Sequence, residues 1–207
     1  PVPSSLASLS SLASLSRAAA MAPSVQARES LIASALDLLT PREIHDALGP
    51  RERLALRYCW PAHRRPLFRR DDGTWGGQAA PPGQWVVWLV SAGRGFGKTR
   101  LGAEWIRDRA MRFPGTRWAI VGETADEARK VMLKGESGLL SVCAPWEKPH
   151  FNFTDQSLEF PNGSSVYLYS AEKPEKFRGP QFHGAWLDEF PKWRRMREAW
   201  DHIRFGV

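Results

Sequence analysis

The sequence predicts an α/β domain, in which helices flank a mainly parallel sheet, preceded by a short helical segment. From Trp85 onwards, apolar stretches of strand length alternate with stretches of helical periodicity, as is typical of parallel strands joined by covering helices. The chain has 207 residues, of which 43% are hydrophobic, which is enough for one packed domain but not for two full enzymatic domains. Its net charge of +7 indicates a polyanionic partner.

The residues ahead of position 78 are expected to lie outside the catalytic domain. Residues 1–22 are a Ser, Ala and Leu repeat that could imitate a targeting segment. They contain one arginine and no charged leader ahead of the leucines, so we interpret them as a disordered or weakly helical extension. Residues 23–77 are interpreted as a helical segment, with Thr40-Pro41 at one helix start, followed by a linker rich in Arg, Gly and Pro. Residues 78–207 form the predicted catalytic domain.

The elements expected in this domain alternate between strand and helix. In order they are the strand Trp85–Val90, the helix Thr99–Met111, the strand Arg117–Gly122, a helix from Thr124 to about Lys134, a hairpin of Phe151–Phe160 with Ser164–Tyr169, the strand Ala185–Asp188 and the helix Lys192–Arg204. Thr124-Ala125-Asp126-Glu127 is a capping box, and Asn162-Gly163 is the strongest short signal for a hairpin turn.

Composition also excludes several classes of protein. No apolar run approaches the roughly 20 residues of a membrane-spanning helix, so we expect a soluble protein that does not bind a membrane. The cysteine usage favours a reducing cytoplasm. Cys59 and Cys143 lie far apart, with no His or Cys at ligand spacing. This pattern predicts neither a zinc site nor a disulfide framework.

A glycine-rich loop, Ser91–Thr99, lies between the first predicted strand and the first predicted helix. It fits the P-loop pattern, except that Ala92 stands where the first glycine is usual. Glycines in such a loop let successive amides converge on phosphates, the lysine contacts the β- and γ-phosphates, and the hydroxyl ligates Mg²⁺. The predicted ATP-binding residues of the loop are Gly93, Arg94, Gly95, Phe96, Gly97, Lys98 and Thr99. The alternative is a glycine-rich turn without a ligand.

Two adjacent carboxylates follow the apolar strand that ends at Leu187. At the carboxyl edge of a parallel sheet they would face the nucleotide, with Asp188 as a Mg²⁺ ligand beside Thr99 and Glu189 as the general base. Alone, such a pair is equally typical of a helix N-terminus. Together with the loop it predicts hydrolysis of ATP, with ATP and Mg²⁺ as cofactors, on a P-loop NTPase fold of the RecA/ASCE type.

The segments PPGQWVVWLVSAGRGFGKTRLGAEWIRD and FRGPQFHGAWLDEF resemble the ATPase domain of large terminase subunits, including those of phages and gene transfer agents. The resemblance covers about residues 78–207. It implies a motor that moves double-stranded DNA into a procapsid in the host cytoplasm, as a homo-oligomeric ring on a portal protein, together with a small terminase subunit. The coupling strand and nuclease domain of this family do not occur before Val207, so we expect no DNA cleavage by this chain.

The same resemblance implies three further site residues. Arg94 matches an arginine early in the family's loop, where it would contact the γ-phosphate as a catalytic residue; the alternative is an arginine that caps a neighbouring carbonyl. Arg178, in Phe177-Arg178-Gly179, matches an arginine finger offered to the neighbouring subunit; the alternative is one more solvated charge. Gln78 matches a glutamine near the adenine, although the GTWGGQ approach departs from the family pattern.

Basic residues cluster in two places, as sequence-independent binding to DNA phosphates requires. The clusters are Arg51, Arg53, Arg57, Arg64, Arg65, Arg69 and Arg70, and then Lys192, Arg194, Arg195 and Arg197. A solvated charged face is the alternative for the second cluster. For the whole chain, the alternatives to a packaging motor are another DNA-dependent, helicase-like P-loop ATPase and a non-catalytic nucleotide-binding docking module.

Overall fold

The computed structural model describes residue 58, residues 64–65, 68–147 and 149–207, and it divides the chain into the compact units Pro1–Gln84 and Trp85–Val207. The expected extension of residues 1–22 and the helices predicted ahead of residue 58 lie outside the described residues. Within the described part of the chain, no helix has both the length and the apolar character needed to span a bilayer.

In the first unit, the predicted irregular linker contains a small antiparallel pair, β1 (Phe68–Arg69) and β2 (Trp75–Gly76). The turn between these strands is closed by Asp72, whose carboxylate accepts a hydrogen bond from the Thr74 amide at 2.9 Å. Aspartate favours such turns because its side chain satisfies a backbone amide two residues on. Hydrogen bonds from the Thr74 hydroxyl and amide lower the pKa of Asp72.

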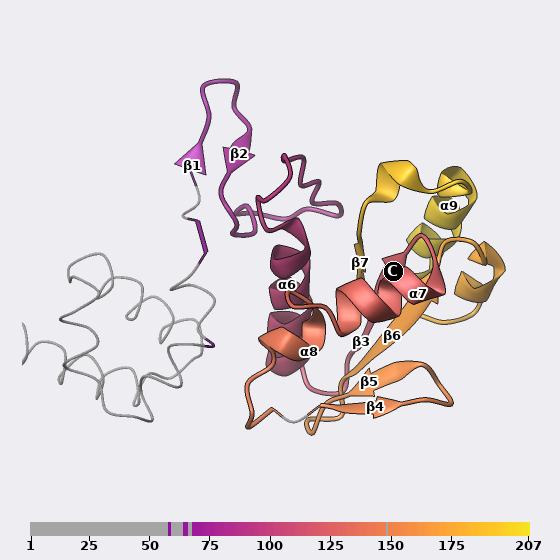
Figure 1. The fold of residues 1–207 in the computed structure, drawn as a ribbon. Helices are drawn as coiled ribbons and strands as arrows, with labels where there is room; N and C mark the ends of the chain where they lie inside the picture. The colour runs from indigo at the N-terminus through magenta and orange to yellow at the C-terminus, as the bar shows by residue number, and fades with distance from the viewer. Residues whose placement is uncertain (1–57, 59–63, 66–67, 148) are drawn as a thin grey trace, which may run out of the picture. The chain divides into compact units, whose positions relative to one another are not determined.

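The second unit contains a five-stranded sheet with the strand order β4-β5-β6-β3-β7 (Figure 1). The strands are β3 (Arg117–Gly122), β4 (His150–Asn152), β5 (Ser157–Glu159), β6 (Ser165–Ser170) and β7 (Gly184–Leu187). β3 pairs in parallel with β6 on one side and β7 on the other, whereas β4, β5 and β6 pair antiparallel. The sheet is therefore mixed. Its parallel part consists of β6, β3 and β7, and the predicted acidic pair follows β7.

Helices cover both faces of this sheet. They are α6 (Lys98–Arg112), α7 (Ala125–Glu127) with a π-helical turn (Ala128–Leu133), α8 (Leu139–Val142), the 3₁₀ turns Pro174–Phe177 and Phe190–Lys192, and α9 (Met196–Gly206). The predicted cap at Thr124 is present, because its hydroxyl accepts a hydrogen bond from the Glu127 amide at 3.1 Å. The last helix begins after the predicted Lys192, because a 3₁₀ turn that contains Pro191 precedes it.

The core has two apolar layers, one on each face of the sheet. Side chains alternate along β3, so that Trp118 and Ile120 pack with α6, α8 and the π-helical turn, while Ala119 and Val121 pack with α9. Nearly all of β3 is buried, as a strand covered on both faces requires. β3 is therefore an interior strand of the sheet that is covered on both faces, in a three-layer α/β unit.

The prediction of a buried strand at Trp85–Val90 is wrong. The segment has no strand structure, and the side chains of Val86 and Leu89 are 89% and 81% exposed. A buried strand needs a neighbouring strand to satisfy its amides and carbonyls, and this segment pairs with none of the described strands of the sheet. The aromatic residues of the segment contact one another and α6, with the Trp85 ring 5.9 Å from that of Trp88 and 6.3 Å from that of Trp105.

The predicted hairpin at Asn162-Gly163 is confirmed, although its first half is divided. β5 pairs with β6 across the turn, with Glu159 opposite Ser165. Gly163 has φ 82°, in the left-handed region that the turn requires. A second reversal separates β4 from β5, where Asn152 accepts hydrogen bonds from the amides of the following turn.

The packing of α6 on β7 yields a first prediction. A Cβ atom at Gly102 would lie 2.1 Å from the Trp186 ring, so we expect Gly102→Ala to destabilise the protein by about 1–3 kcal/mol through overpacking. In a helix without this contact the same change would stabilise by roughly 1 kcal/mol. Chemical denaturation of the wild type and of a Trp186→Leu background measures both cases. An equal loss in the two backgrounds would contradict the proposed clash.

Candidate functional site

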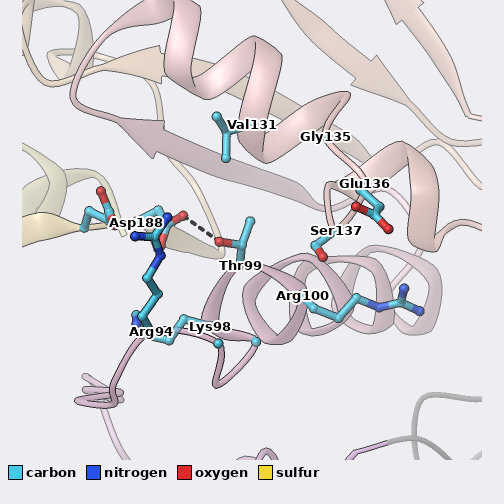
Figure 2. A pocket seen from close by; sticks show the side chains of 12 residues that line it. Arg94, Lys98, Thr99, Arg100, Val131, Gly135, Glu136, Ser137 and Asp188 are labelled. Carbon is cyan, nitrogen blue, oxygen red and sulfur yellow. Dashed lines mark hydrogen bonds between the residues drawn. The ribbon is translucent and has the colours of Figure 1, made fainter.

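A cavity of about 330 Å³ lies where the start of α6 meets the end of β7 (Figure 2). Its wall is built from three segments: the glycine-rich loop with the first turn of α6, the end of the π-helical turn with the turn that follows it, and the acidic pair after β7. The lining residues are Arg94, Gly95, Gly97, Lys98, Thr99, Arg100, Val131, Gly135, Glu136, Ser137, Asp188 and Glu189. The structure thus brings the predicted loop and the predicted acids together.

The loop has the geometry that its glycines allow. Gly95 and Gly97 have φ of 77° and 88°, in the left-handed region open to glycine without strain, and Gly97 is the N-cap residue of α6. Lys98 Nζ donates to the carbonyl oxygens of Ala92 at 2.9 Å and Gly93 at 3.1 Å. The loop therefore curls around its own lysine at the N-terminus of a 15-residue helix, where amide groups and the helix dipole favour an anion.

The acidic pair is positioned by backbone and side-chain bonds. The Asp188 amide donates to the Val121 carbonyl at the end of β3, at 3.2 Å, and the Trp193 indole donates to the Asp188 carbonyl at 3.1 Å. The Thr99 hydroxyl donates to Asp188 Oδ2 at 3.2 Å, across 89 residues of sequence (Figure 2). This bond joins the helix that follows the loop to the strand that carries the acids.

The two carboxylates lie in different surroundings. Burial raises the pKa of Asp188, and the negative charges of Glu189 and Glu127 raise it further, against the hydrogen bond from Thr99, which lowers it. Glu189 is more exposed, has a left-handed φ of 48°, and forms an ion pair with Lys192. That ion pair is the main cause of the raised pKa of Lys192. Asp188 is thus the desolvated acid and Glu189 the accessible one.

Arg94 lies at the rim of the cavity, and Figure 2 shows its side chain extending towards Asp188. Arg100, on the first turn of α6, pairs with Glu104 at 2.6 Å. The wall formed by Val131, Gly135, Glu136 and Ser137 was not foreseen from the sequence. Its Gly-Glu-Ser-Gly run signals a turn and nothing about a ligand, so only the folding of this turn against α6 reveals it.

A buried ionic cluster fixes the position of the middle of α6. Glu104 is 2% exposed and contacts Arg107 at 3.2 Å, and Arg107 in turn contacts Glu147 at 2.7 Å. Burial raises the pKa of Glu104. Burial lowers the pKa of Arg107, but the surrounding negative groups, Glu147 and Glu104 foremost, together outweigh this effect, so that pKa is raised overall. Glu147 also accepts a hydrogen bond from the Ala144 amide at 2.7 Å. The cluster ties α6 to the segment that follows α8.

Two predicted site residues lie elsewhere. Arg178 follows the 3₁₀ turn Pro174–Phe177 and donates from Nε to His202 Nε2 of α9 at 3.2 Å, outside the lining of the cavity. Gln78 belongs to the first unit, where its side chain accepts a hydrogen bond from the Arg65 amide at 2.9 Å. Gly93 and Phe96 are part of the loop but are not among the lining residues. The roles predicted for these residues remain predictions.

Both the sequence and the fold are similar to those of known proteins. A family model described as the N-terminal part of the large terminase subunit of the T4-like virus type matches residues 89–207. The ATPase domain of the Thermus phage P74-26 large terminase matches with 18% identity and a TM-score of 0.41, covering 55% of this chain and 54% of that chain. A point mutant of that domain matches with 16% identity and a TM-score of 0.40, over 55% and 53%.

The chain thus spans about half the length of the solved chains that it matches. No curated protein matches it. The family model begins within the segment ahead of the glycine-rich loop and ends at Val207, so it takes in the loop, the acidic pair and every lining residue of the cavity. Because this match extends over more than half of the sequence, the chain belongs to the family of large terminase subunits.

Proposed function

We propose that this chain is the ATP-hydrolysing motor domain of a large terminase, which translocates double-stranded DNA into a procapsid. The observation that carries the proposal is the Thr99–Asp188 hydrogen bond of 3.2 Å, with Lys98 and Glu189 lining the same cavity. The reaction is the conversion of ATP and water to ADP and phosphate. The P-loop fold of the RecA/ASCE type is part of the same proposal.

The donor set fits a nucleotide with its magnesium ion. A hydroxyl and a carboxylate within hydrogen-bond distance are the hard oxygen ligands that Mg²⁺ prefers, so Thr99 and Asp188 would hold the ion. The ion would supply positive charge that offsets the negative charge of the phosphates. The loop amides from Gly93 to Thr99 would cradle the phosphates, with Lys98 exchanging its loop carbonyls for the β- and γ-phosphate oxygens.

Glu189 is the proposed general base. A carboxylate that lines the cavity and stays accessible can accept the proton of the attacking water, whereas the desolvated Asp188 is better suited to hold a cation. Arg94, on the rim, would contact the γ-phosphate and stabilise charge that develops on it. Gln78 is retained as a proposed adenine contact on the family resemblance alone.

Arg178 is proposed to act on a neighbouring subunit of a homo-oligomeric ring assembled on a portal. Its exposed side chain, outside the cavity of its own chain, supports this role, because an arginine finger must reach a site that its own subunit does not contain. A small terminase subunit and a portal protein are the partners that the family implies.

Double-stranded DNA is the polymer that the motor is proposed to translocate. Two residues of the second basic cluster form ion pairs with acidic side chains. Lys192 pairs with Glu189, and Arg195 pairs with Glu198 at 2.8 Å. These partners reduce the charge that the two residues can offer to phosphates. Arg194 and Arg197 are exposed and carry the proposed DNA contact of this cluster.

Loss of the loop lysine or of the general base should abolish hydrolysis. We expect Lys98→Ala and Glu189→Gln to lower Mg²⁺-dependent phosphate release by about 10² to 10⁴-fold, because each removes a charge from the reacting phosphates or the attacking water. Lys130→Ala, which removes an exposed lysine paired with Asp126, is the matched control and should retain wild-type turnover. If the wild-type chain binds nucleotide but shows no Mg²⁺-dependent turnover, the hydrolysis proposal is wrong and the chain is a docking module.

The desolvated Asp188 should cost stability whenever it is ionised. The pKa of Asp188 in the folded state is raised above the usual 3.8. The protonated carboxyl therefore makes its full contribution to stability below about pH 3.8, and this contribution is lost as the pH rises through the folded-state pKa. We therefore expect Asp188→Asn to raise the melting temperature at pH 7 to 8, with the gain shrinking towards pH 4. Asp201→Asn on the exposed face of α9 is the control, and a gain independent of pH would refute the assignment.

Mixing experiments test the action of Arg178 between subunits. Arg178→Ala and Glu189→Gln proteins should each be inactive, with Arg178→Ala lowering turnover by about 10³ to 10⁵-fold. Mixed assemblies should regain part of the activity, because an intact Arg178 from one subunit then faces an intact Glu189 of its neighbour. Absence of any recovery in assemblies shown to contain both proteins would place Arg178 outside the reaction.

A further inference from the structure

The segment that carries Arg178 is hydrogen-bonded to α9 and its flanking residue at several positions along the helix. Arg195, ahead of the helix, donates to the Glu172 carbonyl at 3.1 Å, and at the other end the Phe182 amide donates to the Gly206 carbonyl at 2.6 Å. Between them, His202 contacts both the Pro174 carbonyl and the Arg178 side chain. α9 is therefore the platform on which the Arg178 segment rests.

The hydrogen bonds of His202 determine its tautomer. Nδ1 lies 3.0 Å from the Pro174 carbonyl oxygen, which can only accept, so Nδ1 carries the proton. In the neutral ring Nε2 then has a lone pair, and it accepts the hydrogen bond from Arg178 Nε at 3.2 Å. Both ring nitrogens are used, one to hold the ring and the other to hold the arginine.

This contact leaves one end of the guanidinium available. Within the described residues, neither Nη nitrogen of Arg178 takes part in a hydrogen bond or ion pair. A guanidinium can bind an oxyanion from its Nε side or from its Nη1–Nη2 end. With Nε engaged by His202, only the Nη1–Nη2 end can face a phosphate.

We propose that His202 is a positioning residue for Arg178, which it holds so that the two Nη groups point outwards to the γ-phosphate bound by a neighbouring subunit. The proposal rests on the proposed function of Arg178 between subunits and adds the residue that orients it. A pre-oriented arginine loses less conformational freedom when it binds phosphate. His202 itself touches neither nucleotide nor water in this arrangement.

Two substitutions of the histidine separate orientation from packing. His202→Leu keeps an apolar body of similar size and removes the acceptor, so we expect turnover of the assembled protein to fall about ten- to hundredfold with little change in KM. His202→Gln places an amide oxygen within reach of Arg178 Nε and should restore most of the activity. His150→Gln, at an exposed histidine of β4, is the matched control and should behave as the wild type.

A double-mutant cycle distinguishes failure of this proposal from failure of the proposed function. If Arg178→Ala alone leaves turnover intact, the finger itself is refuted. If Arg178→Ala abolishes turnover and His202→Leu does not lower it, the finger stands and His202 has no positioning role. Positioning predicts that His202→Leu adds nothing further in an Arg178→Ala background, whereas a purely structural loss would add in both.

Nuclear magnetic resonance of the ¹⁵N-labelled chain provides a readout that does not depend on activity. We expect His202 in the Nδ1–H tautomer, and an Arg178 Nε–H signal that is protected from exchange in the wild type and in His202→Gln but not in His202→Leu. An Nε2–H tautomer, or an Arg178 signal that is unaltered in His202→Leu, would overturn the proposal.

Discussion

The parallel pairing of β7 with β3 is the constraint on which the rest of the site depends. Parallel strands end at the same edge of a sheet, so Asp188 follows β7 at the level where β3 ends, and its amide bonds to Val121. The approach of α6 to β7 across Gly102 brings the helix start to that edge. Without both contacts, Thr99 and Asp188 would not meet across 89 residues.

The carboxylates that line the cavity lower the stability of the folded chain. Burial raises the pKa of Asp188, and the nearby charges of Glu189 and Glu127 raise it further, against the hydrogen bond from Thr99. Cations instead occupy the loop and the outer turn, where Lys98 binds loop carbonyls and Lys192 pairs with Glu189. Such an arrangement costs stability in the isolated chain and favours a ligand that brings its own cation, as a nucleotide with Mg²⁺ does.

α9 connects two parts of the molecule that the sequence treats separately. Its Trp200 packs on Phe190, 5.5 Å between ring centroids, directly after the acidic pair, and its His202 holds Arg178. Trp193, just ahead of the helix, bonds to the Asp188 carbonyl. α9 therefore contacts Phe190, the residue that follows the acidic pair, and also the arginine that is proposed to act on a neighbouring subunit.

Local sequence signals determined the elements that they could define alone. The loop with Gly95 and Gly97, the cap at Thr124, the hairpin turn at Gly163 and the strand before Asp188 depend on backbone preference and short-range hydrogen bonds, and each was predicted with nearly its observed bounds. The family, too, was evident from the loop and the acidic motif, and the matching family model confirms it.

Tertiary structure alone decided the rest, because it depends on which surfaces meet. Trp85–Val90 has the composition of a buried strand, yet burial requires a pairing partner that composition cannot specify. The wall around Ser137 and the partnership of Arg178 with His202 arise from residues distant in sequence, brought together by the docking of helices on the sheet. Local chemistry thus indicated the candidate site residues, and packing determined which of them line one cavity.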